Sequence, residues 1–222
     1  SLQLASNGEV DDEETHSLGM QLLFAPVPTD TSKLPRKLDL ARFGHSACMW
    51  GEGEGTTNMM VVFGGSSESL VRVSSDVLLL DTTTWVWSPL VTTGIAPTNL
   101  ARIGHSAAID QTSNSMYVFG GMRSSRRLLK DLCVLSLDTG VWTTIAPETI
   151  NGHPPPSKFG ASMWLHLPQQ QTEQNGSTRR LPTIILSGGI HGTAPSSSST
   201  SSSSPADAAS GSSVLHSFDM NT

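Results

Sequence analysis

Short apolar runs separated by polar, glycine-containing segments recur along the chain. Val-Val-Phe, Val-Leu-Leu-Leu, Tyr-Val-Phe and Thr-Ile-Ile-Leu are rich in β-branched and aromatic residues and are bounded by Gly, Asp, Ser and Pro. Runs of this kind are typical of β-strands. None of them repeats with the period of about 3.6 residues that marks an amphipathic helix. The pattern therefore predicts an all-β protein of short strands joined by polar loops.

A short phrase also recurs. The chain reads RFGHSA at 42–47 and RIGHSA at 102–107, and a related copy, KFGASM, begins at 158. After each copy come an apolar run ending in Gly-Gly and a second run ending in Asp, and the first two copies then carry a Trp. These landmarks are Gly64, Gly65, Asp81 and Trp85, then Gly120, Gly121, Asp138 and Trp142, then Gly188, Gly189 and Asp219. Landmarks that recur in a fixed order indicate an array of structural repeats.

Each repeat is predicted to hold four strands, named a to d. Strand a is the GHSA segment, strand b runs into the glycine pair, strand c ends at the Asp and strand d holds the Trp. The third copy stops before a matching Trp, so we expect it to be truncated. The expected parts are an acidic, disordered segment, the outer strand of an earlier repeat with its loop, two complete repeats and the truncated third. They span 1–19, 20–41, 42–92, 102–147 and 158–222.

A serine-rich tract, residues 193–213, lengthens the loop between strands b and c of the third repeat. Low-complexity polar sequence buries too little apolar surface to offset the entropy that it loses on ordering. We therefore predict a disordered b–c loop rather than a linker between domains.

The ordered set R-x-G-H-S, Gly-Gly, Asp and Trp resembles the kelch repeat. The resemblance implies a β-propeller of four-stranded antiparallel blades, with strand a nearest the central axis. Propellers have roughly four to eight blades. This chain carries about two and a half repeats, so we expect an incomplete ring, with the remaining blades in the same, longer chain.

The resemblance assigns structural roles to the repeated residues. We expect the glycine pairs to allow positive φ and a close approach of a neighbouring backbone. Trp85 and Trp142 are expected to fill the space between adjacent sheets. His45 and His105 are expected to hydrogen-bond loop backbone near the axis, with a ligand or metal there as the alternative. The aspartates are expected to cap turns; they are Asp81, Asp138 and Asp219.

The composition narrows the setting. The formal net charge is −6, which disfavours a general nucleic-acid-binding surface. Cys48 and Cys133 are the only cysteines, which indicates a reducing compartment, cytoplasmic with the nucleus as the alternative. No apolar stretch approaches the roughly 18 residues of a membrane span. We therefore expect no membrane partner.

No catalytic, cofactor or metal site is predicted. The chain has no HExxH or CxxC motif, and Tyr117 is its only tyrosine, which leaves the tyrosine-based copper chemistry of some kelch-fold oxidases without support. Gly51-x-Gly53-x-Gly55 lacks the lysine of a phosphate-binding loop. Ser46 and Ser106 each follow a His, but strand neighbours point to opposite faces, so no Ser–His couple is expected.

Cations gather in the predicted b–c loops. The first repeat carries Arg72, and the second carries Arg123, Arg126, Arg127 and Lys130. Since neighbouring strands alternate in direction, all b–c loops emerge on one face. Guanidinium groups suit carboxylate or phosphate partners. This face is a predicted docking site for an acidic peptide, with nucleic-acid phosphate less favoured and a merely solvated loop set as the alternative.

These observations predict a non-catalytic kelch-repeat segment that acts as a protein–protein interaction module through its loops. The alternative is an accessory propeller region of a larger enzyme whose active site lies outside this segment. Kelch repeats accompany tRNA wybutosine-synthesis methyltransferase-type enzymes, phosphatases and ubiquitin-ligase adaptors. The sequence does not decide whether the whole protein is an enzyme.

Overall fold

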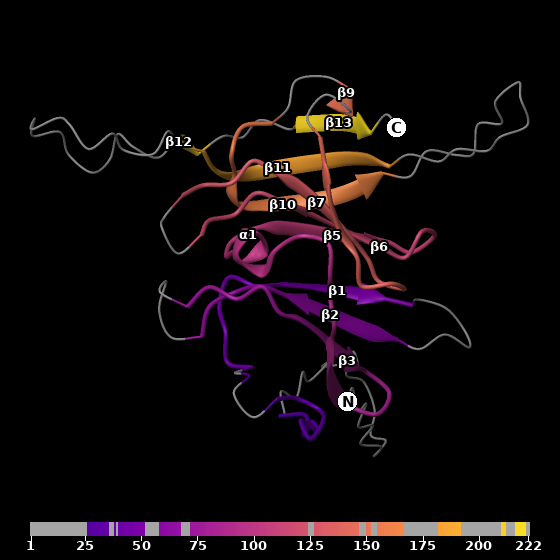
Figure 1. The fold of residues 1–222 in the computed structure, drawn as a ribbon. Coiled ribbons are helices and arrows are strands. Elements are labelled where there is room, and N and C mark those ends of the chain that lie inside the picture. The colour runs from indigo at the N-terminus through magenta and orange to yellow at the C-terminus, as the bar shows by residue number, and fades with distance from the viewer. Residues whose placement is uncertain are drawn as a thin grey trace, which may run out of the picture.

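The computed structural model places three antiparallel sheets side by side, which we call blades 1 to 3 (Figure 1). The structure describes residues 26–35, 38, 40–51, 58–67, 72–123, 127–146, 150–151, 155–166, 182–191, 210–211 and 216–220. The predicted acidic segment 1–19 lies outside these residues.

Blades 1 and 2 each consist of four strands that pair in chain order. Blade 1 is built from β1 (Ser46–Trp50), β2 (Met59–Phe63), β3 (Val77–Asp81) and β4 (Val86–Leu90). Blade 2 is built from β5 (Ser106–Asp110), β6 (Ser115–Phe119), β7 (Leu132–Ser136) and β8 (Trp142–Ile145). A short helix, α1 (Pro97–Leu100), joins the two blades. These strands are the predicted strands a to d.

Blade 3 differs at its outer edge. Its strands are β10 (Phe159–His166), β11 (Thr183–His191), β13 (His216–Met220), β9 (Ile150–Asn151) and β12 (Ser210–Gly211). The place of strand d beside β13 is taken by β9, from the segment that precedes strand a. β12 pairs with the end of β11. Most of the tract 193–213 lies outside the described residues, but its residues 210–211 form this strand, so the prediction of disorder is wrong for them.

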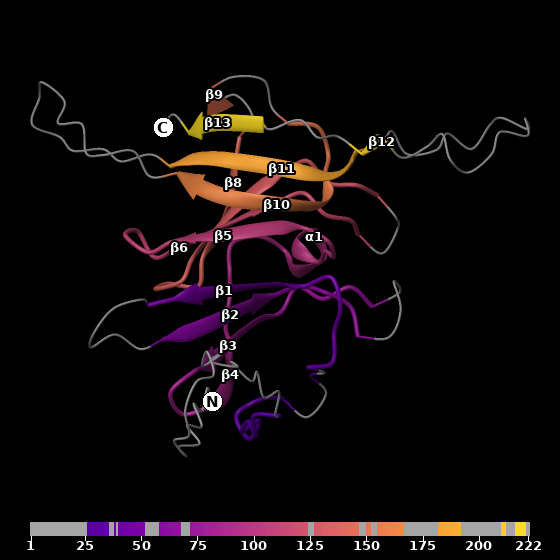
Figure 2. The same cartoon turned by 180° about the vertical axis from the view of Figure 1, so that it is seen from behind.

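The first strands of the three blades lie next to one another, with β5 between β1 and β10 (Figures 1 and 2). β1 and β10 run in the same direction across Figure 1. The three sheets do not close into a ring. The prediction of an all-β, incomplete propeller of four-stranded antiparallel blades is confirmed.

The core consists of two apolar layers between blades. On β6, Met116 and Val118 belong to the layer shared with blade 1, while Tyr117 and Phe119 belong to the layer shared with blade 3. This alternation is the two-residue period of a strand that is covered on both faces. Trp142 is 1% exposed and its ring centroid lies 4.9 Å from that of Phe63 on blade 1. The predicted role of Trp142 between two sheets is confirmed.

The equivalent of Trp142 in blade 1 is Trp87. Leu80 pairs with Trp87 between β3 and β4, as Leu135 pairs with Trp142 between β7 and β8. Trp85 instead lies in the turn before β4, with φ of 59° and 38% of its surface exposed. The prediction that Trp85 fills the space between sheets is therefore wrong.

Trp85 holds the turn position that blade 2 gives to Gly140. The Trp85 amide donates to the Asp81 carbonyl at 2.8 Å, and the Gly140 amide donates to the Ser136 carbonyl at 2.8 Å. Gly140 has φ of 71°, a conformation that glycine adopts freely. The equivalent of Asp81 is therefore Ser136, and Asp138 stands two residues farther on, inside the turn.

The two aspartates consequently have different roles. The Asp81 carboxylate accepts from the amides of Thr83 and Thr84 at 2.8 and 3.1 Å, which confirms a turn cap. The hydrogen bond from the Thr83 amide lowers the pKa of Asp81. Asp138 accepts from the Asn114 side chain at 3.1 and 3.2 Å, so it bridges to another loop rather than capping its own turn. The side chain of Asp219 lies outside the described residues.

Asp30 occupies the place before blade 1 that Thr93 occupies before blade 2. Asp30 bridges Val86 in parallel, and Thr93 bridges Val141 in the same way. Thr93 follows the last residue of β4 by three positions. Residues 26–29, directly before Asp30, form no strand, and residues 20–25, 36–37 and 39 of the predicted segment 20–41 lie outside the described residues, so the outer strand of an earlier repeat stays a prediction.

Candidate functional site

The repeated histidines do not share one environment. His105 Nε2 lies 2.8 Å from the Ser46 hydroxyl on blade 1, and its ring meets Phe63 edge to face at 5.0 Å. Burial lowers the pKa of His105 to about 3, and the nearby Arg102 acts in the same direction. His45, at the same repeat position, is exposed.

The expectation that no Ser–His couple forms is thus wrong for residues of different blades. Neighbours in one strand do diverge, but stacking places Ser46 of one blade against His105 of the next. Among the described residues no polar group contacts the other ring nitrogen, Nδ1. A catalytic triad needs a group that orients the imidazole there. His105 therefore links two blades through a side chain, rather than through loop backbone as expected.

The first letter of the repeated phrase has a structural role that the sequence analysis missed. Each cation donates a hydrogen bond to the first carbonyl of the glycine pair in its own repeat. The bonds run from Arg42 to Gly64 at 2.9 Å, from Arg102 to Gly120 at 3.2 Å, and from Lys158 to Gly188 at 3.0 Å. The recurrence of Arg, Arg and Lys at this position was the available signal.

Arg102 is fully buried and extensively bonded. Its guanidinium contacts both carboxylate oxygens of Asp131, at 2.9 and 3.2 Å, in the one ion pair that the described residues contain. It also donates to the carbonyls of Asn99 and Leu100 at the end of α1. Through Arg102, the end of the second b–c loop, at Asp131, is tied to the helix that joins the blades.

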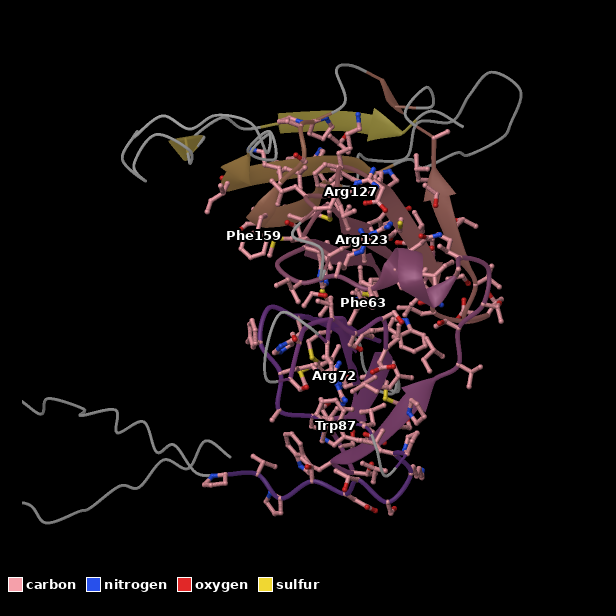
Figure 3. The ribbon with its side chains drawn as sticks, turned by 60° about the vertical axis from the view of Figure 1, so that its left-hand side comes forward. Phe63, Arg72, Trp87, Arg123, Arg127 and Phe159 are labelled. Atoms are coloured by element: carbon pink, nitrogen blue, oxygen red, sulfur yellow. The ribbon has the colours of Figure 1, made fainter. Side chains whose placement is uncertain are left out.

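The b–c loops of blades 1 and 2 begin alike, which puts two arginines in equivalent places. Ser66 bridges Val73 in blade 1, and Met122 bridges Leu128 in blade 2. Arg72 and Arg127 each stand one residue before the returning partner, and both are exposed. Figure 3 shows Arg72 on blade 1, with Arg123 and Arg127 above it on blade 2.

The other cations of this face differ in exposure. Arg123 is half-buried, and its guanidinium donates to the Asn99 carbonyl at 3.1 Å. Its amide donates to the Arg127 carbonyl at 3.1 Å, which holds the two ends of the loop together. Lys130 is exposed. Arg126 lies outside the described residues.

A cavity of about 450 Å³ adjoins Arg72. Arg42, Ser67, Ser74 and Asp76 also line it, so its wall offers hydroxyl groups beside charged groups. The Ser74 hydroxyl donates to the Asp76 carboxylate at 2.7 Å. Within the described part of the chain, Arg72, Arg123, Arg127 and Lys130 form no ion pair. The structure thus leaves the charge of these four side chains for solvent or a partner.

The described residues hold no cluster of three or more His, Cys, Asp or Glu side chains that could bind a metal ion. Cys48 and Cys133 are free thiols, and burial raises the pKa of each to about 11. A thiol with such a pKa is a poor nucleophile at neutral pH.

The family model described as the KLHDC2/KLHL20/DRC7 Kelch-repeats domain matches residues 44–169, more than half of the chain. The chain belongs to the kelch-repeat family. The matched residues run from the glycine that precedes β1 to the segment after β10, so they include blades 1 and 2 completely.

Curated kelch relatives resemble parts of the chain. Host cell factor 1 of Rattus norvegicus is 30% identical over 132 residues, covering 54% of this chain and 6% of the relative. Dynein regulatory complex subunit 7 of Chlamydomonas reinhardtii is 28% identical over 124 residues, covering 55% of this chain and 10% of the relative. Kelch domain-containing protein 3 of Rattus norvegicus is 38% identical over 81 residues, covering 36% and 19%. The chain thus matches a minor share of each relative's length.

Among solved structures, that of YjhT covers 68% of this chain and 35% of its own, at a TM-score of 0.43 and 17% identity. In the part of the kelch chain that the structure describes, no helix is long and apolar enough to cross a membrane.

Proposed function

We propose that this kelch segment is a non-catalytic protein-binding module whose b–c loops dock an acidic segment of a partner protein. The observation that carries the proposal is the equivalent placement of Arg72 and Arg127 on neighbouring blades, both exposed and outside any ion pair among the described residues. Arg123 lies between them, and Lys130 adds a fourth cation. Arg126 belongs to the same loop by sequence.

The chemistry of these side chains favours carboxylates. A guanidinium presents a planar fork that binds both oxygens of a carboxylate, and such bonds are stronger than neutral ones. Arg123 is already held by the Asn99 carbonyl, so it loses less side-chain entropy on binding than a mobile arginine would. Ser67, which also lines the cavity beside Arg72, carries a hydroxyl that can donate to a bound peptide. A phosphate backbone would fit the same groups, but the net charge of −6 disfavours nucleic acid.

A structural role for the repeated residues supports the non-catalytic part of the proposal. His105, Arg102 and Trp142 are each buried within or between blades. The alternative, an accessory propeller of a larger methyltransferase-type enzyme, phosphatase or ubiquitin-ligase adaptor, remains a prediction about the chain outside this segment.

The relatives support the proposal by analogy. Kelch repeats generally mediate protein interactions, and one relative is by name a subunit of a dynein regulatory complex. We further propose a reducing compartment, the cytoplasm with the nucleus as the alternative, since both cysteines are free.

The experiment compares binding of a fluorescent polyglutamate peptide to the full chain and to the double variant Arg72→Glu, Arg127→Glu. The double variant should bind at least about tenfold more weakly, and the wild-type affinity should fall as salt rises because exposed charges are screened. The matched control is Arg179→Glu, Arg180→Glu. By sequence these residues lie between the end of β10 and the start of β11, and those two strand ends are at the opposite end of the sheet from the b–c loops.

Equal loss of binding in the control would show that only the net charge matters, and the docking face would then be wrong. Unchanged binding by a correctly folded Arg72→Glu, Arg127→Glu variant would contradict the proposal as well.

A further inference from the structure

Most of the net charge of the chain comes from one short stretch, which we call the acidic segment. It consists of residues 9–14, which read EVDDEE and carry five of the 19 acidic side chains. The other 14 acids, against 13 Lys and Arg, leave the rest of the chain with a formal charge of −1. The nearest Lys or Arg in the sequence is Lys33. Dense blocks of like charge commonly serve as interaction segments.

The b–c face carries the opposite charge. Arg72 and Arg127 are exposed at equivalent places on neighbouring blades, with Arg123 beside Arg127 (Figure 3). The nearest candidate partner for Arg72 is Asp76, which lines the same cavity, but this carboxylate accepts from the Ser74 hydroxyl and forms no ion pair among the described residues. Guanidinium groups bind carboxylates well, and the densest block of carboxylates in this sequence is the acidic segment.

The course of the chain brings the acidic segment within reach of this face. Asp30 bridges Val86 on blade 1, and Leu38 lines the cavity that Arg72 lines. Residues 15–25 separate the acidic segment from the first described residue. A spacer of that length spans at most roughly 40 Å, which exceeds the diameter of about 30 Å of a small domain. The spacer therefore allows the segment to reach the cations of either blade.

We propose that the acidic segment docks on the b–c face of its own chain and competes there with the acidic segment of a partner protein. This inference rests on the function proposed above, since the same arginines bind both ligands. A ligand joined to its site by a short connection has an effective concentration on the order of 1 mM. A contact with a dissociation constant of about 0.1 mM is then filled roughly ten times more often than it is empty. A partner must displace the segment, so its affinity falls by a similar factor.

The first experiment measures binding of the fluorescent polyglutamate peptide at low salt by a variant with three neutral residues in the acidic segment. This neutral-segment variant is Asp11→Asn, Asp12→Asn, Glu13→Gln. It should bind the peptide several-fold more tightly than the wild type does, by at most about tenfold, because the competing segment is weakened.

The matched control removes the same number of charges elsewhere. It is Glu52→Gln, Glu54→Gln, Glu173→Gln, at positions that lie by sequence between strands a and b of repeats 1 and 3. The control measures how far a change of net charge alone strengthens the binding of a polyanion. Equal tightening in the two variants would overturn the inference.

The second experiment locates the acidic segment by cross-linking. A carbodiimide condenses a carboxylate with an amine in contact with it, forming an amide with loss of water, and Lys130 supplies an exposed amine on the b–c face. Mass spectrometry of the monomer fraction should find the acidic segment joined to Lys130 more often than to Lys33 or Lys37, which lie nearer in the sequence. Cross-links confined to Lys33 and Lys37, or links to Lys130 found only between two copies, would overturn the inference.

The variant Arg72→Glu, Arg127→Glu makes the two proposals fail separately. It should abolish the cross-link to Lys130. If it weakens peptide binding while the neutral-segment variant behaves like its control, the b–c face binds acidic partners and the inference about the acidic segment is wrong. If the cross-link to Lys130 depends on the two arginines but the neutral-segment variant does not bind the peptide, the segment docks as inferred and the proposed function is wrong.

Discussion

The Nε2 atom of His105 lies 2.8 Å from the Ser46 hydroxyl, across the interface between blades 1 and 2. The ring is buried and neutral, so its environment opposes protonation. The two residues belong to successive copies of the GHSA motif, so residues of the repeated motif itself connect one blade to the next.

Stability should depend on pH through His105. Its pKa is lowered to about 3 in the folded chain, against about 6.5 when unfolded. As the pH falls, the unfolded chain therefore takes up a proton at His105 before the folded chain does. The free energy of unfolding should be highest above about pH 6.5 and should fall between about pH 6.5 and 3, by at most about 1.4 kcal/mol per pH unit. Urea unfolding at several pH values measures this slope. His105→Gln should flatten it, whereas His45→Gln at the exposed position should not.

The two tryptophans first aligned by spacing should respond oppositely to substitution. Trp142→Ala removes a fully buried ring and should cost about 3–5 kcal/mol. Trp85→Gly relieves a positive φ in an exposed turn and should leave stability unchanged or raise it by up to about 1 kcal/mol. Denaturant midpoints of the two variants decide the matter. An equal loss in both would contradict the assignment of Trp87, rather than Trp85, as the equivalent of Trp142.

Removing the partner of a buried arginine should be costly. Asp131→Ala leaves Arg102 buried without its carboxylate, and breaking a buried pair costs about 3–5 kcal/mol. The Asp131 side chain is 30% exposed, so we expect the lower end of that range. The control Asp138→Ala removes an exposed carboxylate and should change the melting temperature little. A similar loss in both variants would mean that the ion pair adds nothing specific.

Both thiols should be slow to react in the folded chain. A pKa of about 11 rather than about 8.5 lowers the thiolate fraction at pH 8 by roughly a hundredfold or more. Because the thiolate is the form that reacts, the alkylation rate should fall by a similar factor. Mass spectrometry after iodoacetamide treatment should find Cys48 and Cys133 unmodified in buffer and both modified in urea. Rapid labelling of either cysteine without denaturant would show that its blade opens.

The strand order was predictable because apolar runs and glycine pairs recur with little change. The facing of the b–c loops followed from antiparallel pairing alone. The tryptophan register was not predictable from spacing, because the turn after Asp81 and the turn after Ser136 place their aspartates differently. Counting from Asp to Trp matched Asp81 with Asp138, whereas backbone pairing matches it with Ser136.

The interface contacts were harder to infer because they join residues of different repeats. Adjacency within one strand correctly separates Ser46 from His45, but says nothing about His105 in the next blade. The burial of Arg102 and Lys158 was likewise not predictable, because cations in loops are ordinarily exposed to solvent. For the cationic face, sequence reasoning named the residues, and the structure adds the equivalence of Arg72 and Arg127.

The glycines of the repeated phrase in blades 1 and 2, Gly44 and Gly104, are packed against residues from the start of the next repeat. Lys158 and Phe159 begin the third copy of the phrase, yet they complete the packing over Gly120 and Gly104 of blade 2. A packed blade therefore includes the first residues of the next repeat, so it does not coincide with one copy of the sequence repeat. A boundary drawn at the start of a repeat would therefore cut through the packed interface between two blades.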